Sequence, residues 1–213
     1  MKRTLFVSAT NTGIGKSFAA LELVRYYGEM GYKVGVLKPI ETGVVDVPCD
    51  AALLLETARQ YNTKLLDFGI EDVCPYAFKL PAAPYVARGH TMIEIEILLM
   101  ALQKMQEVSE IVIIEGAGGL LVPIDEKLFM IDIAHLFADK VLLVVPSTLG
   151  SINDTLLSRT LLEAHDLPYV WAVNCYASCE EFAKITAPYY EANGGYLTLQ
   201  KELPTIAQRL LES

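Results

Sequence analysis

The chain has 213 residues, 53% of them hydrophobic, and its formal net charge at pH 7 is −9. A chain of this length and apolar content can bury a sizeable core, so we expect residues 1–213 to form one domain. Non-specific binding of nucleic acid requires a basic surface, and the acidic charge therefore argues against a nucleic-acid partner.

No stretch of the sequence is long and apolar enough to span a membrane, and the N-terminus lacks the apolar segment of a signal peptide. The cysteines lack the paired spacing of a zinc site, and we expect free, mostly buried thiols at Cys49, Cys74, Cys175 and Cys179. These features predict a cytoplasmic protein with no membrane partner.

Apolar runs of strand length alternate with helical patterns along the chain. The predicted strands are Thr4–Val7, Lys33–Leu37, Ile111–Ile114, Val141–Val145 and Tyr169–Val173. The predicted helices are Lys16–Met30, Asp50–Tyr61, Thr91–Val108, Ile152–Ala164 and Cys179–Ala192, and Pro75–Pro84 is predicted to be a loop. Continuously apolar strands separated by helices are typical of an α/β fold whose parallel sheet is flanked by helices on both faces.

The segment Thr10–Ser17 follows the first predicted strand and begins the first predicted helix. It ends in Gly-Lys-Ser, the pattern of a P-loop, in which backbone N–H groups and a lysine bind phosphates and the hydroxyl ligates Mg²⁺. The usual first glycine is replaced by Thr10. The alternative is an ordinary turn with an exposed lysine, but the strand and helix on either side favour a P-loop NTPase-type sheet.

Other candidate residues follow the remaining strands, where ligands of a parallel sheet collect. Glu115 has the position of a Walker B carboxylate, which binds Mg²⁺. Lys38 could face the phosphates or only solvent, and Asp50 could ligate Mg²⁺ or only cap a helix. Asn174 could contact a base or form a turn, and the helix start at residues 150–153 could bind a carboxylate or be a plain cap.

Together these segments resemble the dethiobiotin synthetase family, which closes a ureido ring with ATP and CO₂. The segments that carry the resemblance are Thr10–Ser17, Lys38-Pro39 with Thr42-Gly43, Asp50-Ala51, Pro81–Pro84, Glu115–Gly119 and Leu149–Asn153. One departure is Gly13, which stands where the family often has glutamate.

The resemblance implies a role for each matching residue. It implies that ATP is bound by Thr12, Gly13, Ile14, Gly15, Lys16, Ser17, Glu115, Gly118 and Asn174, and Mg²⁺ by Ser17, Asp50 and Glu115. It implies Lys16, Lys38 and Thr42 as catalytic residues, and Lys38, Thr42, Gly150 and Asn153 as ligands of 7,8-diaminopelargonate. It also implies a homodimer with the substrate site near the interface.

Two other functions of the same fold remain open. A partitioning-type ATPase switch would carry an additional lysine early in the loop, where this chain has Thr10 and Asn11. A small-metabolite kinase would need a lid that bears arginines, and the arginines here are not paired. ATP hydrolysis that depends on a diamine with bicarbonate, on a protein partner or on a phosphate acceptor would distinguish the three.

Overall fold

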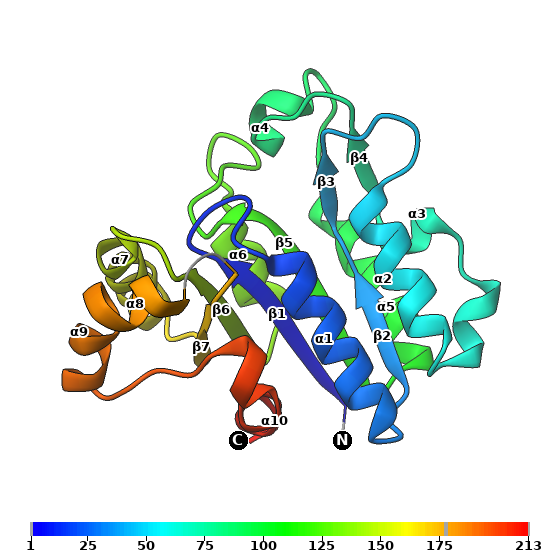
Figure 1. Ribbon diagram of the computed structural model, residues 1–213. Helices are drawn as coiled ribbons and strands as arrows, with labels where there is room; N and C mark the ends of the chain where they lie inside the picture. Colours follow the sequence, from blue (N-terminus) through cyan, green and yellow to red (C-terminus); the bar gives the residue numbers. More distant parts are fainter. Residues whose placement is uncertain (1, 177–178, 213) are drawn as a thin grey trace.

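A computed structural model describes residues 2–176 and 179–212 (Figure 1). Its main sheet has five parallel strands in the order β2-β5-β1-β6-β7. These are β1 (Arg3–Ala9), β2 (Val34–Leu37), β5 (Ile111–Gly119), β6 (Lys140–Pro146) and β7 (Tyr169–Asn174). All five predicted strands are confirmed, but β5 continues past Ile114, so Glu115 lies within the strand and not after it.

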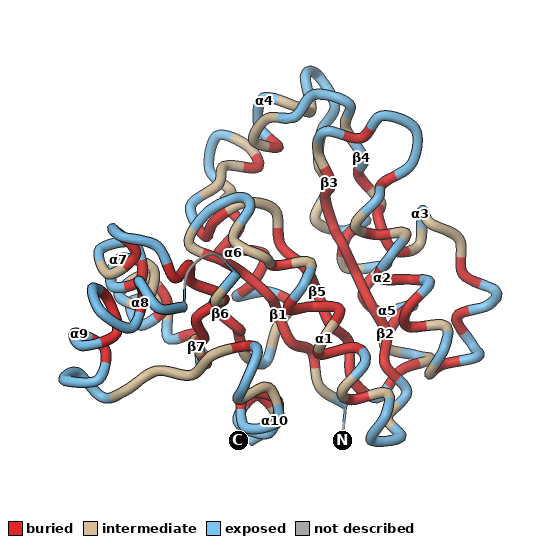
Figure 2. The backbone as a smooth tube through the Cα atoms, viewed as in Figure 1, coloured by how far each residue is buried: buried red, intermediate tan, exposed pale blue. Residues whose placement is uncertain are grey.

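Helices cover both faces of this sheet. In Figure 1, α1 (Lys16–Glu29) and α10 (Leu199–Leu211) lie in front of it, and α2 (Cys49–Arg59) packs beside α1. The opposite face is covered by α5 (Ile95–Val108), α6 (Met130–Phe137) and α7 (Ser151–Ala164). Strand residues are consequently buried on both sides, as Figure 2 shows, which explains why the strands are continuously apolar.

A second, two-stranded sheet was not predicted. It pairs β3 (Ile40–Thr42) in parallel with β4 (Tyr76–Phe78). The prediction of a loop over Pro75–Pro84 is therefore wrong in part, because β4 lies inside it and α4 (Pro84–Ala87) begins at its end. In the sequence, β3 and β4 are separated by α2, the 3₁₀ helix η1 (Thr63–Asp67) and α3 (Ile70–Val73). Strands of three residues are too short to show a hydrophobic period.

The C-terminal third also differs from the prediction. The helix predicted over Cys179–Ala192 is broken at Thr186 into α8 (Cys179–Ile185) and α9 (Ala187–Ala192). The physical reason is Pro188, which has no N–H to donate to the carbonyl four residues earlier. Helix α10 was missed because Pro204 lies inside it and Glu202 has non-helical backbone angles.

The prediction of four free thiols is wrong for two of them. Cys175 follows β7 and Cys179 begins α8, and the fold joins them in a disulfide. Cys74 is free and buried, whereas Cys49 is free and exposed. Within residues 2–176 and 179–212, no helix has the length and apolar character needed to cross a membrane.

Candidate active site

The loop between β1 and α1 has the backbone of an anion-binding turn. Gly13 and Gly15 have φ angles of 77° and 103°, a region that side-chain-bearing residues rarely adopt. Gly15 directly precedes α1, and no side chain caps the N-terminus of that helix. The free N–H groups of the first helical turn are therefore available to an anion, as the sequence predicted.

A pocket of about 290 Å³ lies where this loop meets the carboxyl ends of β2 and β5 and the start of α2. Most of the predicted site residues line it: Thr12, Gly13, Gly15, Lys16, Ser17, Lys38, Thr42, Asp50, Glu115 and Gly118. A second pocket of about 320 Å³ is also lined by Thr12, Thr42 and Gly118 and reaches the proline-rich residues 81–84. The two pockets thus share walls, and together they form an elongated site.

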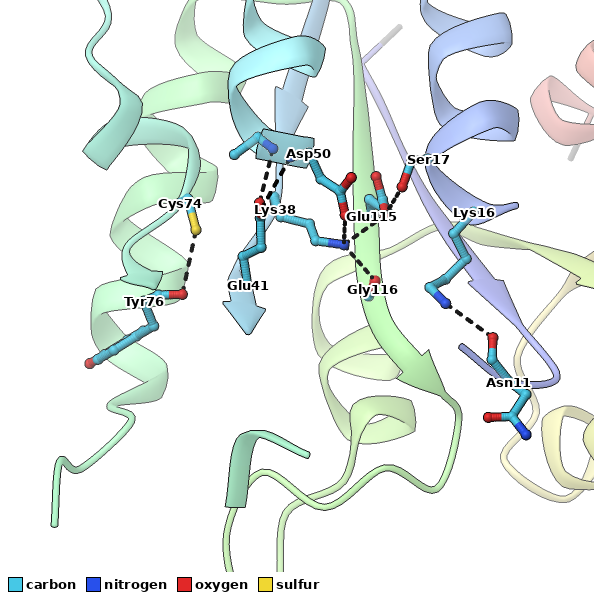
Figure 3. Close-up of polar contacts among 11 residues, drawn as sticks. Asn11, Lys16, Ser17, Lys38, Glu41, Asp50, Cys74, Tyr76, Glu115 and Gly116 are labelled. Atoms are coloured by element: carbon cyan, nitrogen blue, oxygen red, sulfur yellow. Dashed lines mark hydrogen bonds and ion pairs between the residues drawn. The ribbon is translucent and has the colours of Figure 1, made fainter. Parts of the chain in front are cut away.

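Lys38 is the most tightly held cation of this pocket (Figure 3). Its Nζ atom lies 2.6 Å from Glu115 Oε1, 3.1 Å from the Gly116 carbonyl oxygen and 3.5 Å from Asp50 Oδ2. Burial lowers the pKa of Lys38, but the carboxylates of Glu115 and Asp50 outweigh it, so the net shift of the pKa is upward. Lys38 therefore keeps its positive charge although only 4% of it is exposed.

Lys16 lies in the same pocket without a carboxylate partner. Its Nζ donates to the Asn11 carbonyl at 3.2 Å, and 7% of the residue is exposed. Burial first, and the charge of Lys38 second, lower the pKa of Lys16 to about 8. An anion bound beside Lys16 would stabilise the charged ammonium and so offset both effects on its pKa, which is the electrostatic condition of a phosphate site.

The residues predicted to hold Mg²⁺ lie together, and their chemistry fits the ion. Ser17 Oγ donates to Glu115 Oε1 at 2.8 Å, while the buried Glu115 Oε2 accepts no hydrogen bond from any described residue. Hydroxyl and carboxylate oxygens are the ligands that Mg²⁺ prefers. Within the described ranges no three His, Cys, Asp or Glu side chains form a metal cluster, so phosphate and water oxygens would have to complete the shell.

Glu41 is a pocket residue that sequence reasoning missed. Its carboxylate accepts the backbone N–H groups of Asp50 at 3.1 Å and of Ala51 at 3.0 Å. The residue before α2 is Pro48, whose side chain cannot cap the helix, so Glu41 supplies the acceptors from β3. Burial raises the pKa of Glu41, and the two N–H bonds oppose that shift. The sequence signal was its place in the segment Lys38–Gly43, between the candidate residues Lys38 and Thr42.

Four predicted residues lie elsewhere. Asn174 donates its amide to the Ile14 carbonyl at 2.8 Å, and neither residue lines the two pockets. Gly150 and Asn153 lie at the N-terminus of α7, where Asn153 is exposed and bonds only its neighbour Asp154 among the contacts described. A groove of about 630 Å³, lined by Thr10, Asn11, residues 119–123 and α7, separates that helix from the loop.

Fold and pocket together define a P-loop NTPase. The sequence model of the AAA domain matches residues 3–189. Among solved structures, the chain resembles a plasmid partition protein of Borrelia burgdorferi, with a TM-score of 0.60, 13% identity, and coverage of 99% of this chain and 96% of that one. It also resembles the MinD cell division protein of Aquifex aeolicus, with a TM-score of 0.52, 20% identity, and coverage of 98% and 87%. At these identities the likeness shows the fold alone.

Sequence relatives give the family. An ATP-dependent dethiobiotin synthetase of Sulfurovum is 41% identical, covering 89% of this chain and 90% of the relative. The Wolinella succinogenes enzyme of that name is 37% identical over 99% of both chains, and that of Helicobacter pylori 38% identical over 88% of both. The chain belongs to the family of ATP-dependent dethiobiotin synthetases, which are ligases that form carbon–nitrogen bonds. Family membership favours the prediction of a dethiobiotin synthetase over those of a partitioning-type ATPase switch and a small-metabolite kinase.

Proposed function

We propose that the protein joins CO₂ to 7,8-diaminopelargonate and closes the ureido ring of dethiobiotin, converting ATP to ADP and phosphate. The observation that carries the proposal is the convergence of two lysines with Ser17, Asp50 and Glu115 on one pocket at the end of a phosphate-binding loop. The charge of Lys38 is balanced by carboxylates, whereas no carboxylate pairs with Lys16 among the contacts described. The pocket can therefore take up an added negative charge beside Lys16.

The phosphates of ATP occupy the loop in this proposal. N–H groups at residues 12–17 and the ammonium of Lys16 bind the phosphate oxygens, and the backbone at Gly118 lies against the nucleotide. Ser17, Asp50 and Glu115 would hold Mg²⁺ through oxygen atoms, and Glu115 Oε2 is available for this because no described residue hydrogen-bonds to it. The bound ion would neutralise charge that develops on the transferred phosphoryl group.

The reaction proceeds in three steps. One amine of the substrate adds to CO₂ and loses a proton, which gives a carbamate. A carbamate oxygen attacks the γ-phosphorus, the bond to ADP breaks, and a carbamic-phosphoric anhydride forms. The second amine attacks the carbonyl carbon, expels phosphate and loses a proton as the ring closes. Lys16, Lys38 and Thr42 position the reactants and offset negative charge, and no side chain is assigned as a general base.

The distant carboxylate of the substrate binds at the N-terminus of α7, which carries Gly150 and Asn153. No side chain caps this helix, and although the Ser151 N–H donates to the Thr148 carbonyl at 3.2 Å, no backbone partner outside the helix is described for the N–H groups of Ile152 and Asn153. Since these residues line neither pocket of the loop, we propose that a second copy of the chain supplies them. Two exposed leucines that line the groove, Leu121 and Leu157, support such a homodimer, as does the exposed Leu149 just before α7.

Phosphate release from Mg·ATP is the experiment that tests the function. We expect release only when bicarbonate and 7,8-diaminopelargonate are both present, with dethiobiotin among the products. Release that is indifferent to the diamine would refute the proposal and leave the switch or the kinase. The cytoplasmic location and the single domain over residues 1–213 stay predictions.

A further inference from the structure

Gln200, at the start of α10, is linked to the phosphate-binding loop through Asn174. Its Nε2 donates to Asn174 Oδ1 at 2.6 Å, and Asn174 Nδ2 donates to the Ile14 carbonyl at 2.8 Å. Gln200 Oε1 accepts the backbone N–H of Cys175 at 3.1 Å. An unbroken series of hydrogen bonds therefore runs from the end of β7, by way of α10, to the loop.

Backbone groups at both ends fix the orientation of the two amides. The Cys175 N–H can only donate, so Gln200 presents Oε1 to it and has Nε2 left for Asn174. The Ile14 carbonyl can only accept, so Asn174 presents Nδ2 to it and has Oδ1 left for Gln200. Neither amide can turn over without bringing two donors or two acceptors together.

The Ile14 carbonyl matters because its peptide continues into Gly15. In a trans peptide the carbonyl and the N–H point in opposite directions, so a carbonyl held by Asn174 directs the Gly15 N–H away from Asn174. Gly15 lines the pocket and Asn174 does not. Successive N–H groups of this kind of loop are the donors that bind phosphate oxygens.

The contact between Asn174 and the loop is also close. A Cβ atom on Gly15 would lie 2.1 Å from Asn174 Nδ2, and only 4% of Asn174 is exposed. The amide therefore fills the space behind the loop, and a rotation of the amide would require the loop to shift.

We propose that Gln200 is a positioning residue for nucleotide binding, which holds the Ile14–Gly15 peptide in its phosphate-binding orientation through Asn174. The inference rests on the proposed binding of ATP phosphates at this loop. Each polar atom of Asn174 has one partner inside the protein, and the bond from Nδ2 to the Ile14 carbonyl carries the effect of Gln200 to the phosphates.

The test compares Mg·ADP with tripolyphosphate, which carries phosphates but no base, by titration calorimetry on the full chain. Gln200→Leu removes both hydrogen bonds of the side chain. We expect the Kd of both ligands to rise, and that of tripolyphosphate to rise by about threefold to tenfold, as for one neutral hydrogen bond. Gln200→Glu keeps the acceptor for the Cys175 N–H but places a carboxylate against Asn174 Oδ1, so we expect a larger rise.

Gln208→Leu, a change of an exposed glutamine on the same helix, is the matched control and should bind both ligands like the wild type. A purely structural role of Gln200 would lower the Tm and leave both Kd values unchanged, which would overturn the proposal. A loss confined to ADP would also overturn it, since Gln200 would then act on the base. A wild-type protein that binds neither ligand would refute the proposed function, and this inference with it.

Discussion

The two lysines of the pocket differ in what balances their charge. Lys38 has Glu115 and Asp50 as partners, whereas Lys16 donates only to a carbonyl among the contacts described. The positive charge of Lys16 is therefore the one most available to a bound phosphate, and its removal should weaken phosphate binding most. We expect Lys16→Ala to lower kcat/KM for ATP by about 100-fold to 1,000-fold, as when a preorganised donor is lost. Lys64→Ala, at an exposed position, is the control, and unchanged turnover in Lys16→Ala would refute its role.

Glu41 should matter to stability and to the metal together. Gln in its place keeps one acceptor oxygen but turns an NH₂ group toward an N–H of α2. We expect Glu41→Gln to lower the free energy of unfolding by about 1–3 kcal/mol, as when a bond to a charged acceptor is lost. It should also raise the Mg²⁺ concentration needed for half-maximal phosphate release, because Asp50 is one of the two residues that Glu41 holds.

Urea unfolding and a magnesium titration measure these two effects of Glu41→Gln. Glu56→Gln, an exposed position on the same helix, provides the comparison. If both variants behave like the wild type, Glu41 does not anchor α2.

We expect the thiol of Cys74 not to react with alkylating reagents. Its thiol is 5% exposed, and burial, with Glu41 as a lesser cause, raises its pKa to about 12. Only the thiolate attacks an alkylating reagent, so at pH 8 we expect iodoacetamide to modify the exposed Cys49 and leave Cys74 intact. Mass spectrometry of the native protein measures both sites, and rapid labelling of Cys74 would contradict its burial.

At the scale of elements, the contribution of the α1–α10 contact to stability can be measured through one hydrogen bond. Tyr27 in α1 is 1% exposed and donates its hydroxyl to the Ala207 carbonyl in α10 at 2.7 Å. Tyr27→Phe removes this hydrogen bond between the two helices, and we expect a loss of about 0.5–1.5 kcal/mol in the free energy of unfolding. Denaturant unfolding measures it. Tyr189→Phe, at a more exposed site, should change little; equal losses in both variants would show that the α10 contact is unimportant.

The main sheet could be predicted because its strands are buried on both faces and so are uniformly apolar. Helices with few breakers, such as α1 and α7, were found within a residue or so of their bounds. The prediction missed α3, α4, α6, α10, β3 and β4, and for two of these elements the cause is that they depend on tertiary packing. Helix α10 tolerates Pro204 because its apolar side packs on β7 and α1, and β3 exists because β4 pairs with it. Neither partner is visible in a local pattern.

The same distinction applies to the site. Lys16, Lys38, Asp50 and Glu115 could be singled out because each was predicted to follow a strand or to begin a helix at one sheet edge. The structure brings all four to one pocket, although Glu115 lies inside β5. Glu41 was missed because it acts through backbone N–H groups from another element, which leaves no motif. The contacts of Asn174 likewise depend on how Gln200 packs, which the sequence does not reveal.

At the scale of the whole molecule, the homodimer can be tested directly. Leu157 lines the groove beside α7 and is 64% exposed. A charge there would be buried in the proposed interface, so we expect Leu157→Glu to sediment as a monomer and to lose most of its activity. Leu66→Glu changes a leucine of equal exposure on η1 and should do neither. A wild-type monomer with full activity would refute the shared site.

The central position of β1 has a consequence for biosynthesis of the chain. Of the five strands of the main sheet, β1 is made first, yet its partners in the described part of the chain are β5 and β6, so both its edges wait until residues 111–119 and 140–146 have been made. The phosphate-binding loop follows β1 directly, so it cannot take up a fixed position before these two partner strands have been made. During translation an apolar strand therefore remains uncovered for much of the synthesis, and the nascent protein should depend on chaperones more than one whose neighbouring strands follow each other in sequence.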